Sequence, residues 1–129
     1  MNREIAPSTI APAVANYAHA MICTSSTRPL YTSGVVPIRP DGTVPAEIDQ
    51  QADVVWASLI AILTEAKMTV AHVVSVTTYV VVDYLGALPQ VMAARDRALQ
   101  GHRAASTLVT VPALARPEWK LEISLIASW

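Results

Sequence analysis

The order of apolar and polar positions predicts a chain that alternates between strands and helices. Residues 28–38 predict a strand, and residues 72–82 predict a second one that is rich in β-branched residues on both faces, which is typical of a strand buried on both sides. Residues 105–111 and 119–127 predict two more strands. A hairpin partner that precedes this set is expected around residues 19–26.

Two helices are predicted where apolar residues recur at three- and four-residue steps. Residues 46–67 carry one apolar stripe, after a turn over residues 39–45. Residues 85–100 contain the second helix, with Pro89 in its first turn and Gly101 just past its end. The order β–α–β–α–β–β predicts an α+β fold, a two-layer sandwich of a mixed β-sheet with two helices on one face.

The last predicted strand separates its side chains onto two faces, because successive residues of a strand point in opposite directions. One face comprises Leu121, Ile123 and Leu125. The other comprises Lys120, Glu122, Ser124 and Ile126. We assign the apolar face to the helices, so the second face lies where subunits would share it.

Composition points to self-association. The chain has 129 residues, which predicts a single domain over residues 1–129. Of these residues 53% are hydrophobic and 15% are charged, against about 25% charged in typical globular proteins. A small domain with so few charges cannot cover its own surface with polar groups, and burying apolar surface against further copies solves that problem. We therefore expect a homo-oligomer.

Charge and hydropathy disfavour several partners. The net charge is −1 and the cationic residues are scattered, which argues against nucleic-acid binding. The longest strongly apolar run, residues 73–82, has ten residues, whereas a membrane-spanning helix needs about 20. Pro7 and Pro12 interrupt the stretch in which a signal peptide would be apolar. We expect a cytoplasmic protein with no membrane partner.

Cysteine and histidine give little sign of metal or redox chemistry. The single cysteine, Cys23, excludes an internal disulfide and is expected to be a small buried residue of a strand. His19 and His102 are far apart, and no cysteine or carboxylate stands at metal-ligand spacing from either. We expect both histidines to be structural or at the surface, and no metal site.

Several stretches, in this order and with this spacing, resemble the Rid/YjgF family of reactive-intermediate deaminases. They are PAVANYAHAM (12–21), LYTSGVVPIRPDGTVP (30–45) and ASTLVTVPALARPEWKLEISLIA (105–127), together with the two helices between them. The resemblance covers nearly the whole chain. It implies a chorismate-mutase-like fold, a homotrimer with ligand clefts between neighbouring subunits, and hydrolysis of 2-imino or enamino acids to 2-oxo acids and ammonia. It implies no cofactor.

The resemblance also implies roles for particular residues. Tyr17, Ser33 and Gly34 match positions that line the family's cleft, and Glu122 matches a glutamate that positions or activates water. In active members an arginine at the mouth of the penultimate strand grips the substrate carboxylate, a task that suits a planar bidentate donor.

That arginine is missing from this sequence, which makes the chain a divergent member. An ungapped alignment puts Ser106 at its position, and an alignment with one inserted residue puts Ala105 there. Arg103, two or three residues upstream, either reaches back into the same cleft as the group that binds anions or stands as a solvated charge at its rim. The small Ala105 and Ser106 would leave space for a bulkier ligand.

Two functions therefore stay open. The first is a Rid-type hydrolytic deaminase of an imine or enamine whose substrate differs from the small 2-imino acids. The second is a non-catalytic trimer that uses the same cleft to bind a small carboxylate or aromatic metabolite. A third, RNA cleavage, is a label that some family members have received, and the lack of a basic patch disfavours it.

Overall fold

Four strands form the main sheet of the protein in a computed structural model, which describes residues 2–24 and 27–129. Their order across the sheet is β3 (Pro29–Tyr31), β6 (Leu121–Ser128), β4 (Val73–Val81) and β5 (Ala105–Val111). β4 and β5 run parallel, whereas β6 is antiparallel to both of its neighbours, so the sheet is mixed.

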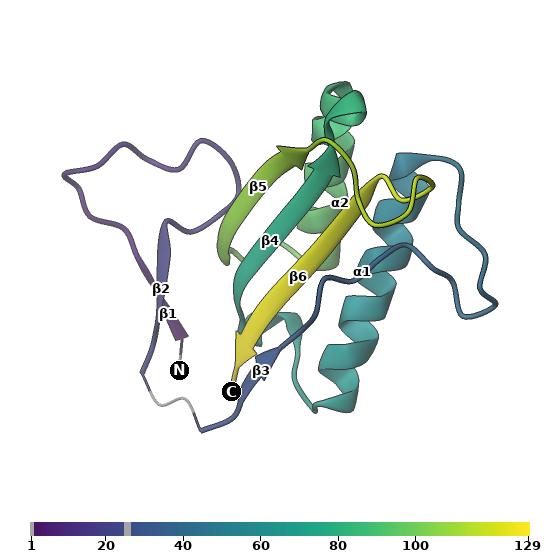
Figure 1. Ribbon diagram of the computed structural model, residues 1–129. Coiled ribbons are helices and arrows are strands. Elements are labelled where there is room, and N and C mark those ends of the chain that lie inside the picture. Colours follow the sequence, from purple (N-terminus) through teal and green to yellow (C-terminus); the bar gives the residue numbers. More distant parts are fainter. Residues whose placement is uncertain (1, 25–26) are drawn as a thin grey trace.

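Both long helices, α1 (Ile48–Glu65) and α2 (Leu88–Ala98), cover the same face of this sheet (Figure 1). The apolar stripe of α1 is buried against the sheet through Ala52, Val55 and Leu59. Short 3₁₀ helices, η1 (Val70–His72) and η2 (Val82–Ala87), flank β4. The predicted α+β sandwich is thus confirmed. In the part of the chain that the structure describes, no helix has the length and apolar character that crossing a membrane requires.

The two faces of β6 are divided as predicted. Leu121, Ile123 and Leu125 are buried in the core between the sheet and the helices. Glu122 lies between them on the strand and therefore points to the opposite face, level with Tyr79 of β4. The face that carries Glu122 is called the open face below.

The N-terminal strands form a small sheet of their own. β1 (Asn2–Ile5) pairs antiparallel with β2 (Ala20–Cys23), and Figure 1 shows this pair beside the main sheet rather than within it. The predicted hairpin around residues 19–26 is therefore found in part, with residues 25 and 26 outside the described residues. Cys23 is exposed, so its predicted burial is wrong. The cause is that this two-stranded sheet has no core behind it at Cys23.

The predicted strand over residues 28–38 is much shorter in the structure, because a side chain interrupts its pairing. The Thr32 amide still donates to the Leu125 carbonyl at 3.0 Å, but the Leu125 amide donates to the Thr32 hydroxyl at 2.9 Å instead of to a backbone carbonyl. Regular pairing then stops, and it returns as a single bridge between Val35 and Ile123. Ser33 and Gly34 lie in the interruption, beside β6.

Gln51 fixes the point at which the chain enters β6. Its side chain is fully buried within α1, and its Nε2 donates to the carbonyls of Pro45 and Glu118, each at 2.8 Å. Its Oε1 accepts from the Lys120 amide at 2.9 Å. Because Lys120 directly precedes β6, these three hydrogen bonds set the level along the sheet at which Glu122 stands.

The turn before α1 forms as its sequence predicts. Gly42 has a φ of +87°, a conformation that glycine adopts without strain. The hydroxyl of Thr43 donates to the Asp41 carboxylate at 2.7 Å, and the Thr43 amide donates at 3.0 Å. These two hydrogen bonds lower the pKa of the Asp41 carboxyl below its ordinary value.

The open face of the main sheet is half-buried to exposed along three neighbouring strands. Its side chains are Ser75, Thr77, Tyr79, Ala105, Thr107, Val109, Glu122, Ser124 and Ile126. A sheet face that mixes apolar groups with small hydroxyls suits contact with further copies of the chain.

Replacing Gln51 by leucine should strongly destabilise the fold. The backbone groups of Pro45, Glu118 and Lys120 would lose their partner, which should lower the free energy of unfolding by about 2–4 kcal/mol. The exposed neighbour provides the control, since Gln50→Leu should change it by less than about 0.5 kcal/mol. Urea unfolding at one fixed protein concentration measures both. Equal midpoints for the two variants would contradict this role of Gln51.

The open face should make the protein a trimer. Sedimentation at micromolar concentration should give three times the monomer mass of 13.8 kDa. Thr77→Lys places a charge in the middle of the open face and should shift the protein to monomers. Thr64→Lys, on the exposed side of α1, should leave the mass unchanged. A native monomer, or a Thr77→Lys trimer as stable as the native one, would refute the assignment.

Candidate functional site

One group of the candidate residues gathers around Glu122 on the open face. Glu122 is half-buried and stands beside the segment that contains Ser33 and Gly34. That segment is held against β6 by two hydrogen bonds between Val35 and Ile123, of 2.7 and 3.1 Å. We call Glu122, Ser33 and Gly34 the glutamate half-site.

Gly34 is required because the Glu122 side chain occupies the space beside it. A Cβ atom added to Gly34 would lie 2.6 Å from Cδ of Glu122 and closer still to Oε2. No side chain fits there unless the carboxylate moves. The Glu122 carboxylate therefore lies against bare backbone.

A second group forms around Arg103, just before β5. Its guanidinium donates to the Tyr17 carbonyl through Nε at 3.2 Å and Nη2 at 2.6 Å. Nη2 also lies 3.2 Å from Oε1 of Glu4, and the Arg103 side chain is 40% exposed. One edge of the guanidinium is thus already bound within the chain. We call Arg103, Tyr17 and Ala105 the arginine half-site.

Backbone pairing brings Tyr17 to Arg103. The Ala18 amide donates to the Ala104 carbonyl at 2.9 Å, and Ala18 forms an isolated bridge with Ala105. The Tyr17 carbonyl therefore lies beside the mouth of β5, where Arg103 donates to it. The Tyr17 ring instead meets His19 edge-on, with 5.6 Å between ring centroids.

The structure distinguishes the two residues that sequence alignment offers at the arginine position. Ala105 pairs with Ser75 and shares the open face, whereas the next residue, Ser106, points to the opposite face. There the Ser106 hydroxyl accepts from Nη1 of Arg95 at 3.4 Å. Ala105 is thus the residue on the same face as Glu122.

Sequence reasoning overlooked Arg95. This arginine of α2 is 6% exposed, and its hydrogen bond to Ser106 places it beneath the mouth of β5. Its Nη2 is 3.1 Å from the Asp96 carboxylate. In the sequence, Arg95-Asp96-Arg97 has the form of a solvated charged turn of helix, and only the packing of α2 against β5 distinguishes Arg95 from its neighbour Arg97.

Within one chain the two half-sites stand at opposite ends of β4. The arginine half-site is level with Ser75, and Glu122 is level with Tyr79, on the strand beyond β4. Four residues of strand correspond to about 13 Å, and two strand spacings add about 10 Å across the sheet, so Ala105 and Glu122 are about 16 Å apart. The structure thus joins Glu122 to Gly34 and Arg103 to Tyr17, but it does not join these two pairs in one chain.

The side chains do not gather in the manner of a metal site. Among the residues that the structure describes, no three histidine, cysteine, aspartate or glutamate side chains come together. The chemistry available at these half-sites is that of a carboxylate, backbone donors and a guanidinium.

Comparisons with known proteins agree with this architecture. The model of the family described as Endoribonuclease L-PSP matches residues 8–129. A Yersinia pestis protein of unknown function from the conserved Rid family, YyfB, is 32% identical with a TM-score of 0.90, and the match covers 99% of this chain and 98% of that one. No curated protein matches the chain.

Two Escherichia coli structures share the fold. The YjgF gene product is 27% identical with a TM-score of 0.71, and 98% of each chain is covered. TdcF, solved with bound serine, is 23% identical with a TM-score of 0.72 and the same coverage of both chains. The family match and the Yersinia relative together extend over almost every residue, and the chain belongs to the Endoribonuclease L-PSP family, the group that includes the Rid and YjgF proteins.

Proposed function

We propose that the protein is a hydrolytic deaminase that acts on an imine or enamine. The observation that carries this proposal is the Glu122 carboxylate lying against Gly34 on the open face. A carboxylate beside backbone that has no side chain can hold a water molecule next to a small planar substrate. Membership of the Rid group supports this choice of reaction.

The reaction needs few protein groups. Water adds to the imine carbon while Glu122 accepts one of its protons. Glu122 returns that proton to nitrogen, which gives the neutral carbinolamine. Glu122 then takes the proton of the new hydroxyl and passes it to nitrogen as the C–N bond breaks, so the C=O bond forms and ammonia leaves. Glu122 acts first as a base and then as an acid, and it ends the cycle as a carboxylate. No oxidant or reductant is consumed.

We infer that the site is completed between two copies of the chain. A small substrate cannot touch both Glu122 and the mouth of β5 across about 16 Å. Association through the open face would bring the glutamate half-site of one subunit toward the arginine half-site of its neighbour. The predicted trimer would then hold three such sites, with Tyr17 and Arg103 on one side and Ser33, Gly34 and Glu122 on the other.

The arginine half-site favours a substrate other than the small 2-imino acids. Ala105, on the open face, offers no charge to a carboxylate. Arg103 already binds the Tyr17 carbonyl and Glu4, so two of its nitrogens are not available for a bidentate grip unless those contacts break. We propose a bulkier imine that uses the space above Ala105 and makes at most one contact with Arg103.

The same observation favours a second candidate, a trimer that binds a small metabolite without turnover. If Arg103 serves only to hold the N-terminal segment, the cleft keeps the hydrogen-bonding groups of the glutamate half-site and loses the clamp that orients a substrate. The two candidates differ in what Glu122 does, because a base is needed for hydrolysis and not for binding.

RNA cleavage is not proposed, although the family description names an endoribonuclease. Holding a polyanion requires a continuous basic surface. Arg95 is buried beneath β5, and Arg103 is partly neutralised by Glu4, so neither adds to such a surface.

Small 2-imino acids should gain little from the native protein, and Ala105→Arg should change that. With 2-iminopropionate released by a dehydratase, we expect decay close to the uncatalysed rate. Ala105→Arg adds a guanidinium on the open face and should raise the rate by at least about tenfold. Ser106→Arg, directed toward Arg95, should give no such gain. Strong acceleration by the native protein would show that Arg103 already serves as the clamp.

Glu122→Gln separates the two candidate functions in the same assay. Imines made by an amino-acid oxidase from larger amino acids should release ammonia faster with the native protein and not with Glu122→Gln. Binding of the corresponding 2-oxo acid should persist in that variant. Binding without any acceleration by the native protein would instead establish the non-catalytic trimer.

Gly34→Ala should impair turnover more than stability. The new Cβ must displace the Glu122 carboxylate by about 1 Å, which should lower kcat by about 100-fold. The unfolding midpoint should change little because the carboxylate is the mobile end of its side chain. Gly86→Ala provides the control, since a Cβ added there would meet no atom within 4 Å beyond its chain neighbours. Equal rates for the two variants would show that the Gly34–Glu122 contact is not part of the site.

A further inference from the structure

Arg103 has two pairs of N–H groups with which it can bind an oxygen, and the chain fully occupies only one of them. A guanidinium offers Nε and Nη2 along its side, and Nη1 and Nη2 at its end. The Tyr17 carbonyl accepts from Nε at 3.2 Å and from Nη2 at 2.6 Å, so it occupies the side pair. We call Nη1 and Nη2 the end pair. A ligand that binds Arg103 without displacing Tyr17 must use the end pair.

A carboxylate of the chain already lies at the end pair. Oε1 of Glu4 is 3.2 Å from Nη2 of Arg103. One hydrogen of Nη2 is directed to the Tyr17 carbonyl, so the hydrogen that remains for Glu4 belongs to the end pair. Nη1 has no hydrogen-bond partner within residues 2–24 and 27–129. Glu4 therefore takes one half of the end pair and leaves the other half open.

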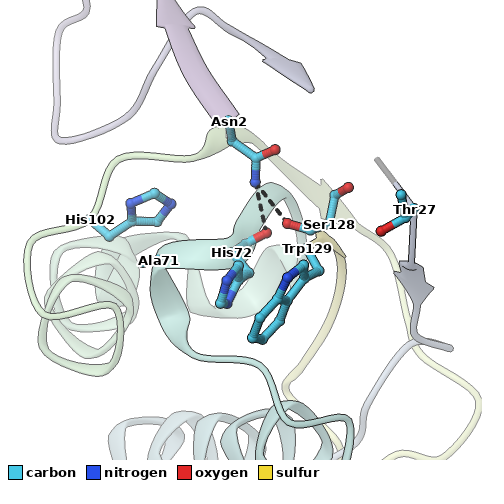
Figure 2. Close-up of a pocket in the computed structure, with 7 residues that line it drawn as sticks. All are labelled: Asn2, Thr27, Ala71, His72, His102, Ser128 and Trp129. Carbon is cyan, nitrogen blue, oxygen red and sulfur yellow. Dashed lines mark hydrogen bonds between the residues drawn. The ribbon is translucent and has the colours of Figure 1, made fainter. Parts of the chain in front are cut away.

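The face of β1 that carries Glu4 points toward the main sheet. Alternate residues of a strand share a face, so Asn2 and Glu4 lie on the same side of β1. Figure 2 shows Asn2 with its hydrogen bonds to the carbonyls of Ser128, at 2.9 Å, and His72, at 3.4 Å. The anchoring of Asn2 at the end of β6 thus directs Glu4 toward the body of the molecule.

The backbone around Arg103 is anchored as well. Nε2 of His102 donates to the Val73 carbonyl at 2.7 Å, which ties the residue before Arg103 to the start of β4. The Ala104 carbonyl accepts from the Ala18 amide at 2.9 Å. Both members of the Glu4–Arg103 pair therefore extend from backbone that other contacts hold in place.

We propose that Glu4 is a built-in competitor for the carboxylate of a ligand at Arg103. The proposal rests on the function proposed above, in which the arginine half-site meets the ligand. While Glu4 stays, a ligand reaches only Nη1, which gives a single contact. When Glu4 moves away, a ligand carboxylate can bind Nη1 and Nη2 together while Tyr17 keeps its place. Glu4 thereby lowers the affinity for carboxylates and favours ligands that bind through the rest of the cleft.

The contact between Glu4 and Arg103 is weak enough for a ligand to replace. The side chains of Arg103 and Glu4 are 40% and 31% exposed. Water screens ion pairs with this exposure, and they contribute little. A ligand carboxylate with two parallel hydrogen bonds to the end pair is the stronger partner. Removing the charge of Glu4 should therefore raise the affinity for carboxylates by a small factor that a titration can measure.

Glu4→Gln tests the competition because it removes the charge and keeps the size of the side chain. The probe is 4-methyl-2-oxopentanoate, the 2-oxo acid that corresponds to a larger imine, and its neutral amide is the matched ligand. NMR titration of ¹⁵N-labelled protein at fixed ionic strength measures both affinities. We expect Glu4→Gln to bind the acid about two- to fivefold more tightly than the native protein and to bind the amide equally.

Two further variants show whether the gain acts through Arg103. Glu65→Gln makes the same change of net charge at the exposed end of α1, and it should leave the affinity for the acid unchanged. In a protein that also carries Arg103→Gln, Glu4→Gln should give no gain. The proposal would be overturned by equal affinity of the native and Glu4→Gln proteins, by absence of binding in both, or by a gain that persists without Arg103.

The test separates this role of Glu4 from the deaminase activity, because a 2-oxo acid binds without being hydrolysed. A gain that requires Arg103 would support the competition even if no variant accelerated imine hydrolysis. Hydrolysis that depends on Glu122, together with unchanged binding by Glu4→Gln, would overturn the role of Glu4 alone.

Discussion

The alternation of side chains along β6 is the constraint on which the rest of the molecule depends. This strand pairs with β3 on one side and β4 on the other, and Leu121, Ile123 and Leu125 pack beneath α1. Once these three are buried, Glu122 has only the open face available, because a shift of one residue would bury its charge. Burying the core therefore also places the Glu122 carboxylate on the open face. The hydrogen bonds of Gln51 set the register of β6.

Much of this fold could be predicted because helices and the buried faces of strands leave a periodic record in the sequence. Features that depend on strand pairing or on a single side chain leave no such periodic pattern, and the sequence did not predict them. β1 has four residues with two charges among them, and the exposure of Cys23 follows from its pairing with that strand. The early end of β3 depends on one Thr32 hydroxyl. Ala105 and Ser106 could not be assigned to faces until the pairing with β4 fixed the register of β5.

Under the proposed function, the two half-sites retain the frame of the site while its recognition of the substrate changes. The pairing that brings Tyr17 to the mouth of β5 is made by backbone and needs no particular side chain. A guanidinium at residue 103 turns to that backbone and to Glu4, whereas one at residue 105 would lie on the open face. Moving a cation by two positions along the strand would thus take it from contacts within the chain to the open face.

β1 joins two parts of the molecule, the end of β6 and the mouth of β5. Asn2 donates to the backbone at the end of β6, and Glu4, two residues later, is the carboxylate beside Arg103. Two-stranded sheets are barely stable alone in water, so these anchors hold β1 in place. Local unfolding of these four residues would break the bond to the end of β6 and release the arginine together. Amide hydrogens across β1 should accordingly exchange as one unit, and the two regions share one opening equilibrium.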